Sequence, residues 1–217
     1  MIGPMLIRFF VICPFLILLP IPQASLADTV ATMSTTEGCS YDCAEMLALD
    51  KNAFDQDSEG GWRSVARQDG CKVEAADLIR DYIVEHKAQS TILFFHEAQL
   101  RAMAGQTKQA LQLFPQTHKP ASETDRIGWN HYVDATIAFL RKDKDALLEA
   151  KTELVKTPKP DGYNPLDIDG NPIDMIWPPN LNVVDGFIDC FEQDYDWAYN
   201  NCSRPFLKTD AKPKQQT

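Results

Sequence analysis

The sequence predicts an all-α protein built from stacked antiparallel helical hairpins, followed by a proline-rich loop and C-terminal helices. Apolar residues recur at helical spacing over much of the chain, and no stretch alternates apolar and polar residues as a half-buried strand does. β-Branched residues are scattered rather than grouped in runs. Small residues recur between the predicted helices at a nearly constant interval. Together these observations favour paired helices over any sheet.

The composition is that of a globular protein with an acidic surface. The chain has 217 residues, of which 44% are hydrophobic and 24% charged, which argues against a disordered, collagen-like or multi-pass membrane chain. Lys and Arg number 21 against 31 Asp and Glu, giving a formal net charge of −10. Because an acidic surface repels phosphate backbones and anionic lipid head groups, we expect no binding to nucleic acid.

Residues 1–27 have the layout of an export signal. Arg8 precedes an apolar run, and Ser25 and Ala27 place small side chains at the −3 and −1 positions of a signal-peptidase site. The run is shorter than the roughly 20 apolar residues that a membrane span needs. We therefore expect a periplasmic or secreted protein with no stable membrane insertion after cleavage; an uncleaved anchor is the alternative. Residues 28–38 are small and polar, which predicts a flexible tail.

Cysteines of an exported protein are candidates for disulfides. Removal of the signal leaves Cys39, Cys43, Cys71, Cys190 and Cys202. Cys190–Cys202 is the favoured pair, because the short stretch between them suits a helical hairpin. Cys43–Cys71 is the second choice, because it would tie the first helix to the next hairpin. Cys39 and Cys43 would face the same way one helical turn apart, which is poor geometry for bonding each other.

The helical-repeat domain is expected to span residues 39–156. Clusters of Gly or polar residues mark its turns, at 55–61, 69–70, 105 and 141–143. Between the turns, each segment presents one apolar and one polar face. The expected helices cover residues 41–51, 62–68, 73–84, 93–104, 106–114, 125–140 and 143–156.

The hairpins recur at a nearly fixed interval. Gly70 and Ala75 are followed 35 residues later by Gly105 and Ala110, and Ala146 comes 36 residues after Ala110. A small residue after the first helix permits a tight turn, and Ala in the second helix lets the partner helix approach closely. Hairpins of this kind stack because none can bury its own apolar face. A helical bundle with hairpins of similar length is the alternative.

One unit carries the residues of a known repeat family. Phe94, Ala98, Gly105, Ala110 and Phe114 occupy aromatic, small, glycine, alanine and aromatic positions, and the chain thereby resembles the tetratricopeptide repeat, whose period is 34 residues. The resemblance implies an α–α superhelix over about half of the mature chain. Segments such as GWRSVARQDGC and HEAQLRAMAGQ also resemble exported bacterial proteins, a resemblance that implies no reaction and no catalytic residue.

The resemblance to tetratricopeptide repeats also implies a binding groove. In that family the first helix of each pair lines a concave surface, and by position its side chains here would be Arg67, Phe95, Gln99, His131 and Phe139. This strip mixes aromatic and polar residues instead of clustering Lys and Asn, so it differs from the clamp that grips a terminal carboxylate. Aromatic anchors with hydrogen-bonding side chains suit an extended or helical peptide.

The C-terminal third departs from the repeat. Residues 157–180 contain six of the 14 prolines, a density that excludes regular helix and sheet. Apolar residues among them predict a loop that packs along the helices. Helices of the same domain are expected again over residues 181–204, with Phe187 and Phe191 on the buried stripe. Residues 205–217 are expected to form a disordered tail.

The sequence lacks the familiar signatures of catalysis. His96 starts a stretch like a zinc-protease helix, but Leu100 stands where the second His is needed. The acidic run over residues 167–174 lacks the first and twelfth ligands of an EF-hand. We find no G-x-S-x-G elbow and no Gly-rich phosphate loop. His131 and Asp134 remain as a possible imidazole–carboxylate pair one helical turn apart. We expect no metal and no cofactor.

These observations predict a non-enzymatic protein that binds a protein or peptide partner in the cell envelope. A periplasmic immunity-type inhibitor is one alternative, since an acidic surface suits the basic active site of a toxin. A hydrolase of unknown substrate is another, using either His131 with Asp134 or His96 with Glu97. A structural role in an envelope assembly is the third.

Overall fold

The computed structural model describes residues 38–120, 125–166 and 170–203. The expected export signal, nearly all of the expected N-terminal tail and the expected C-terminal tail lie outside the described residues. Within the described ranges, no helix combines the length and the apolar character needed to cross a bilayer.

The prediction of an all-α protein is confirmed. The described part of the chain contains no β-strand, and an antiparallel bridge joins Leu166 to Pro172. The helices are α1 (Cys43–Leu47), α2 (Lys51–Asp55), α3 (Gly61–Ala66), α4 (Lys72–Glu85), α5 (Thr91–Met103), α6 (Thr107–Leu113), the 3-10 helix η1 (Phe114–Thr117), α7 (Trp129–Leu140), α8 (Lys144–Val155), α9 (Leu181–Asp189), α10 (Tyr195–Trp197) and the π-helix η2 (Ala198–Cys202).

Aspartate caps start the two short helices at the N-terminal end of the described chain. The side chain of Asp42 accepts a hydrogen bond from the Glu45 N–H and starts α1, and that of Asp50 accepts from two N–H groups of α2. An aspartate at this position satisfies backbone donors that have no partner inside the helix. The helix predicted over residues 41–51 is therefore shorter, as α1, and a second short helix, α2, begins where the predicted helix was expected to end.

The three hairpins α3–α4, α5–α6 and α7–α8 each turn through a residue in the left-handed region. Gly70 and Gly105 have φ angles of 76° and 75°, and the third turn uses Lys142 with a φ of 57°. The small residue before α4 and α6 is thus explained by backbone conformation, because glycine adopts this region without steric cost. In the third hairpin the position equivalent to Gly105 is Lys142, within the turn expected at residues 141–143.

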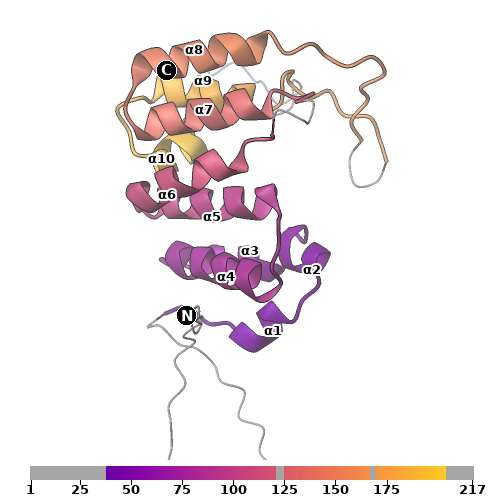
Figure 1. Ribbon diagram of the computed structural model, residues 1–217, viewed down its shortest axis with the longest axis vertical. Coiled ribbons are helices and arrows are strands. Elements are labelled where there is room, and N and C mark those ends of the chain that lie inside the picture. The colour runs from indigo at the N-terminus through magenta and orange to yellow at the C-terminus, as the bar shows by residue number, and fades with distance from the viewer. Residues whose placement is uncertain (1–37, 121–124, 167–169, 204–217) are drawn as a thin grey trace, which may run out of the picture.

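Helix pairs pack in sequence order into a stack that is visible in Figure 1. Two groups of buried side chains lie inside it, a first core around Phe54 and Leu78 and a second core around Phe114 and Leu147. Helix α5 joins them, since its Leu93 packs in the first core while other residues of the same helix pack in the second. Neighbouring hairpins therefore bury faces that none of them could bury alone.

The C-terminal helices cover the face of α7 that was expected to be an open groove. The ring of Phe139 on α7 stacks on Phe187 of α9 with centroids 4.6 Å apart, and Tyr195 of α10 lies 6.2 Å away. Helix α10 also contacts α5. A salt bridge joins it to α4, in which Lys72 Nζ donates to Asp196 Oδ2 at 2.7 Å. We call helices α9, α10 and η2 the C-terminal cap. Because the cap fills this face, Phe139 belongs to the core.

One disulfide prediction is right and the other is wrong. Cys190–Cys202 is present and closes the C-terminal cap, whereas Cys71 is bonded to Cys39 and Cys43 is in neither disulfide. The prediction tied the first helix to the next hairpin through Cys43, but the bridge is made by Cys39, in the segment that precedes α1. Two hydrogen bonds between Ser40 and Gln68 hold the preceding segment beside Cys71. Two disulfides are typical of proteins that fold in an oxidising compartment.

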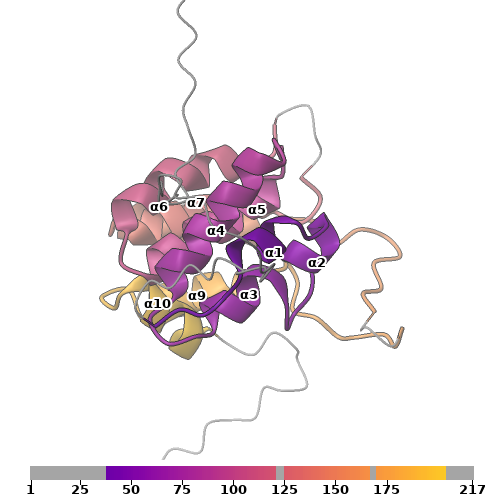
Figure 2. The same cartoon turned by 90° about the horizontal axis from the view of Figure 1, so that it is seen from below.

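The proline-rich loop packs at its ends and projects in between. Trp177 Nε1 donates to the carbonyl of Thr157 at 2.9 Å, and its ring contacts Tyr163. Leu166, in contrast, is 54% exposed. Figures 1 and 2 both show the loop extending away from the helices. Among the apolar residues of the loop, Leu166 therefore projects, whereas Tyr163 and Trp177 are half-buried.

Candidate functional site

The five residues expected to line a concave groove do not form one surface. Phe95 and Phe139 are buried, with 4% and 1% exposed, so neither can contact a partner. Arg67 is exposed at the end of α3, where its guanidinium pairs with Glu59 at 3.0 Å. Gln99 is half-buried on α5. His131 lies at an open hollow on the α7–α8 hairpin.

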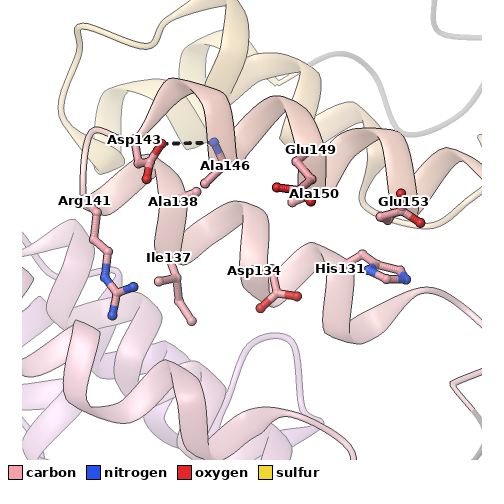
Figure 3. A pocket seen from close by; sticks show the side chains of 10 residues that line it. All are labelled: His131, Asp134, Ile137, Ala138, Arg141, Asp143, Ala146, Glu149, Ala150 and Glu153. Atoms are coloured by element: carbon pink, nitrogen blue, oxygen red, sulfur yellow. Dashed lines mark hydrogen bonds between the residues drawn. The ribbon is translucent and has the colours of Figure 1, made fainter.

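That hollow is a groove on the exposed face of the α7–α8 hairpin, with a volume of about 410 Å³. Figure 3 shows its side chains coming from the two antiparallel helices. We call it the acidic groove and define it by its ten lining residues: His131, Asp134, Ile137, Ala138, Arg141, Asp143, Ala146, Glu149, Ala150 and Glu153.

Small side chains form the floor of the acidic groove. Ala138 of α7 and Ala150 of α8 are 4% and 7% exposed, and Ala146 lies beside them. These alanines recur at helical spacing, so they lie on the facing sides of the two helices. Because alanine projects only a methyl group, the backbones of α7 and α8 lie close to the surface and leave room above the floor.

Carboxylates form both rims of the acidic groove. Asp134 projects from α7, and Glu149 and Glu153 project from α8 one turn apart (Figure 3). Asp134 accepts a hydrogen bond from His118 Nε2 at 2.9 Å, and its side chain is 53% exposed. The hydrogen bond from Lys156 lowers the pKa of Glu153, which favours its charged form.

The end of the groove nearest the α7–α8 turn carries charges of both signs. Arg141 and Asp143 lie there, and the Asp143 side chain is engaged as the cap of α8, accepting the Ala146 N–H at 3.0 Å. Four carboxylates face one guanidinium and one imidazole across the whole lining. None of these lining residues is a serine, threonine, cysteine or lysine, so the groove offers no side-chain nucleophile of those types. Its chemistry suits recognition of a cation.

Both histidine–carboxylate pairs expected from the sequence are wrong. Asp134 pairs with His118 instead of His131, and Glu97 pairs with Arg101 across 2.9 Å. His96 pairs instead with Asp55, whose Oδ1 lies 2.7 Å from His96 Nδ1. The two residues are 41 positions apart in sequence, and no local pattern connects them.

Asp55 is a buried carboxylate that several donors hold in place. It is 0% exposed and accepts hydrogen bonds from Trp62 Nε1 at 2.9 Å and Gln56 Nε2 at 2.6 Å, besides the contact with His96. Burial raises its pKa, but the hydrogen bonds from His96 and Trp62 outweigh burial and bring the pKa down to about 2. The carboxylate is therefore ionised at neutral pH.

The ionised carboxylate of Asp55 also determines the tautomer of His96. Since a carboxylate only accepts hydrogen bonds, His96 Nδ1 must carry the proton that it shares with Asp55. Arg63 donates to the backbone carbonyl of Asp55, and its guanidinium lies 4.1 Å from the centre of the Trp62 ring. This network joins α2 and α3 to α5, and we assign it a structural role.

Acidification is expected to remove about 2 kcal/mol of stability through Asp55 alone. Its pKa is lowered from 3.8 to about 2 by folding, so its contribution is fully present above about pH 5 and is lost as the pH falls through 2. Urea unfolding of the wild type and of Asp55→Asn at several pH values measures this contribution. The difference in unfolding free energy between the wild type and Asp55→Asn should become smaller towards low pH. A difference that does not change with pH would contradict the lowered pKa of Asp55.

One further cluster has metal-ligand atoms close together. In the described residues, the sulfurs of Cys39 and Cys71 and a carboxylate oxygen of Glu74 lie within 4.8 Å of one another. The two sulfurs are bonded to each other in a disulfide, whereas metals bind cysteine in its thiolate form. The oxidised protein therefore does not offer these sulfurs as ligands.

Comparisons of the chain with protein-family models, with curated proteins and with solved structures find no match. Fold and site together define this protein as an all-α, disulfide-bonded helical stack with an acidic groove on its α7–α8 hairpin.

Proposed function

We propose that this protein is a non-enzymatic binder that takes up a cationic segment of a protein or peptide partner in the acidic groove, outside the cytoplasm. The observation that carries the proposal is the groove itself, an open hollow with an alanine floor and carboxylates on both rims. The floor lets the main chain of a ligand approach closely, and the rims complement Lys or Arg side chains on either side of it.

The net charge of −10 supports the same kind of partner. The negative net charge produces an electrostatic potential that attracts a cationic ligand over several ångströms and raises the rate at which the two meet. The basic surface of an enzyme is one such ligand, and an immunity-type inhibitor would be a special case of this function. The two disulfides support a site of action in an oxidising compartment.

The stacked hairpins also support a tetratricopeptide-like arrangement, with one change in where the partner binds. The C-terminal cap occupies the face of α7 that would correspond to the family's groove, through Phe187 and Tyr195. The hollow on the other side of the α7–α8 hairpin remains accessible. We therefore place the partner on the acidic groove, in place of the concave surface implied by the family resemblance.

Reversing the charge of one rim is expected to weaken binding of a cationic peptide by about 30-fold, or about 2 kcal/mol. The probe is a fluorescent, alanine-based peptide with a lysine at every fourth position, titrated with the mature protein and with Glu149→Lys/Glu153→Lys. An otherwise identical peptide with glutamate in place of lysine should not bind.

The matched control is Glu45→Lys/Glu85→Lys, which makes the same change of net charge at exposed positions on α1 and α4. It should weaken binding less than about threefold, because only long-range attraction is lost. Equal loss in both variants, or no binding of the lysine peptide to the wild type, would overturn the proposed function.

A further inference from the structure

The last 14 residues of the chain have a charge opposite to that of the rest. Residues 204–217 carry four cations and a single anion, whereas the whole chain has a net charge of −10. The anion is Asp210. The cations are Arg204, Lys208, Lys212 and Lys214. We call this stretch the C-terminal segment.

The spacing of these cations matches the spacing of the carboxylates on one rim. Arg204, Lys208 and Lys212 are four residues apart, as are Glu149 and Glu153 on α8. Residues four apart lie on one face of a helix about 6 Å from each other. A helical turn of the C-terminal segment laid along α8 would therefore bring two cations to two carboxylates at once.

Other features of the segment suit the same placement. Pro205 stands before and Pro213 after the stretch that holds Lys208 and Lys212. Proline is tolerated at the first position of a helix and commonly follows its end. Phe206 and the leucine after it supply apolar side chains for contact with the alanine floor.

The attachment point of the segment lies close enough to the groove. The backbone of Ser203 abuts Gly186 of α9, where an added Cβ would come within 2.6 Å of the Ser203 nitrogen. The preceding residue of α9, Asp185, pairs with Lys151 of α8 at 2.7 Å. Lys151 is on the same helix as Glu149 and Glu153 but two positions from each, so it lies on the opposite face of α8 and the segment must pass around that helix. The five residues from Ser203 to Lys208 span at most about 18 Å when extended, which exceeds the roughly 10 Å diameter of a helix, so Lys208 can pass around α8 to the groove.

We propose that the C-terminal segment is an internal ligand of the acidic groove, which a cationic partner must displace. The inference rests on the proposed function, because both place a cationic segment in the same groove. A tethered ligand acts at an effective concentration of the order of millimolar, so even a weak contact competes with a partner. A partner would thus bind only if its affinity for the groove is high enough to displace the segment, which favours partners whose cations match the carboxylates of the groove.

A zero-length carbodiimide cross-link between a lysine and a carboxylate tests the contact directly, without any partner. In the mature wild-type chain, mass spectrometry should find Lys208 or Lys212 joined to Glu149 or Glu153. These cross-links should disappear in Glu149→Gln/Glu153→Gln and persist in Glu45→Gln/Glu85→Gln. They should also disappear in about 0.5 M NaCl, where the Debye length is roughly 4 Å.

Three outcomes would overturn the proposal: no cross-link to the groove, cross-links unaffected by the groove variant, or cross-links that join two chains. The last is recognised by mixing chains labelled with heavy and light nitrogen, and it would assign the groove to a second copy.

Binding of the lysine peptide then separates this inference from the proposed function. Lys208→Glu/Lys212→Glu should bind the peptide at least about fivefold more tightly than the wild type, since the internal competitor is removed. If the peptide binds both proteins equally, the internal ligand is wrong and the proposed function stands. If the cross-links form but the peptide binds neither protein, the internal contact stands and the proposed partner is wrong.

Discussion

Replacing Asp55 with alanine is expected to lower the free energy of unfolding by about 3–5 kcal/mol. The carboxylate is fully buried and accepts from Trp62 Nε1 and His96 Nδ1. Its removal leaves both donors without their acceptor in a place that water reaches poorly, and a buried unsatisfied donor costs about 1–3 kcal/mol. The loss is measured by urea unfolding followed by circular dichroism at neutral pH.

The matched control is Asp69→Ala, which removes a carboxylate that is exposed in the turn before α4. It should change the unfolding free energy by less than about 0.5 kcal/mol. If Asp55→Ala were as mild as this control, the network of Asp55, Trp62 and His96 would not hold α2 and α3 to α5.

Replacing Phe139 with alanine is expected to cost about 3–5 kcal/mol, because it opens a cavity in the second core. The ring is 1% exposed and lies against Phe187 at 4.6 Å and Phe191 at 6.1 Å between ring centres. Lys142 Nζ lies 4.2 Å from the centre of the same ring. The C-terminal cap should loosen together with α7, which thermal unfolding and hydrogen exchange over residues 181–203 can detect.

Leu148→Ala provides the comparison, since Leu148 lies on the neighbouring helix α8 and is 42% exposed. It should cost less than about 1 kcal/mol. The pair of variants distinguishes a core from a groove: a ligand-contacting Phe139 would lose binding without losing stability. A small effect of Phe139→Ala on stability would show that the cap does not depend on this contact.

Local patterns predicted most of the helices and one disulfide. Helical spacing of apolar residues located the segments that form α4, α5 and α8 to within a few residues. The turns at Gly70 and Gly105 were recognisable because their positive φ angles favour glycine. Cys190–Cys202 was predictable because only a short hairpin separates the two cysteines.

Errors arose where an outcome depends on contacts between distant segments. Cys43–Cys71 was chosen over Cys39–Cys71 because nothing in the spacing shows that the chain before α1 runs beside Cys71. The partners of His96 and Asp134 were sought on the same helix, at the adjacent Glu97 and at His131 one turn away. Their actual partners, Asp55 and His118, come from other elements.

The acidic groove was only partly predictable. His131 was expected at a binding surface and does line the groove, but the carboxylates of α8 were not recognised as members of the same site. A signal was present in the sequence, since Ala146 and Ala150 alternate with Glu149 and Glu153 along one side of α8. Its meaning depended on which face of α8 the C-terminal cap would leave uncovered.

The amino-acid sequence by itself determined the helical class, the helix-starting aspartates and which side of each helix is apolar, because these depend on residues within one or two turns of each other. The tertiary structure decided which apolar side meets which neighbour. It turned the face of Phe139 into core and left the carboxylates of α8 at the surface. The physical reason is that the free energy gained by hydrophobic burial is proportional to the apolar area removed from water and does not depend on direction. Any apolar segment within reach can therefore cover an apolar face. In this protein, that segment is the C-terminal cap.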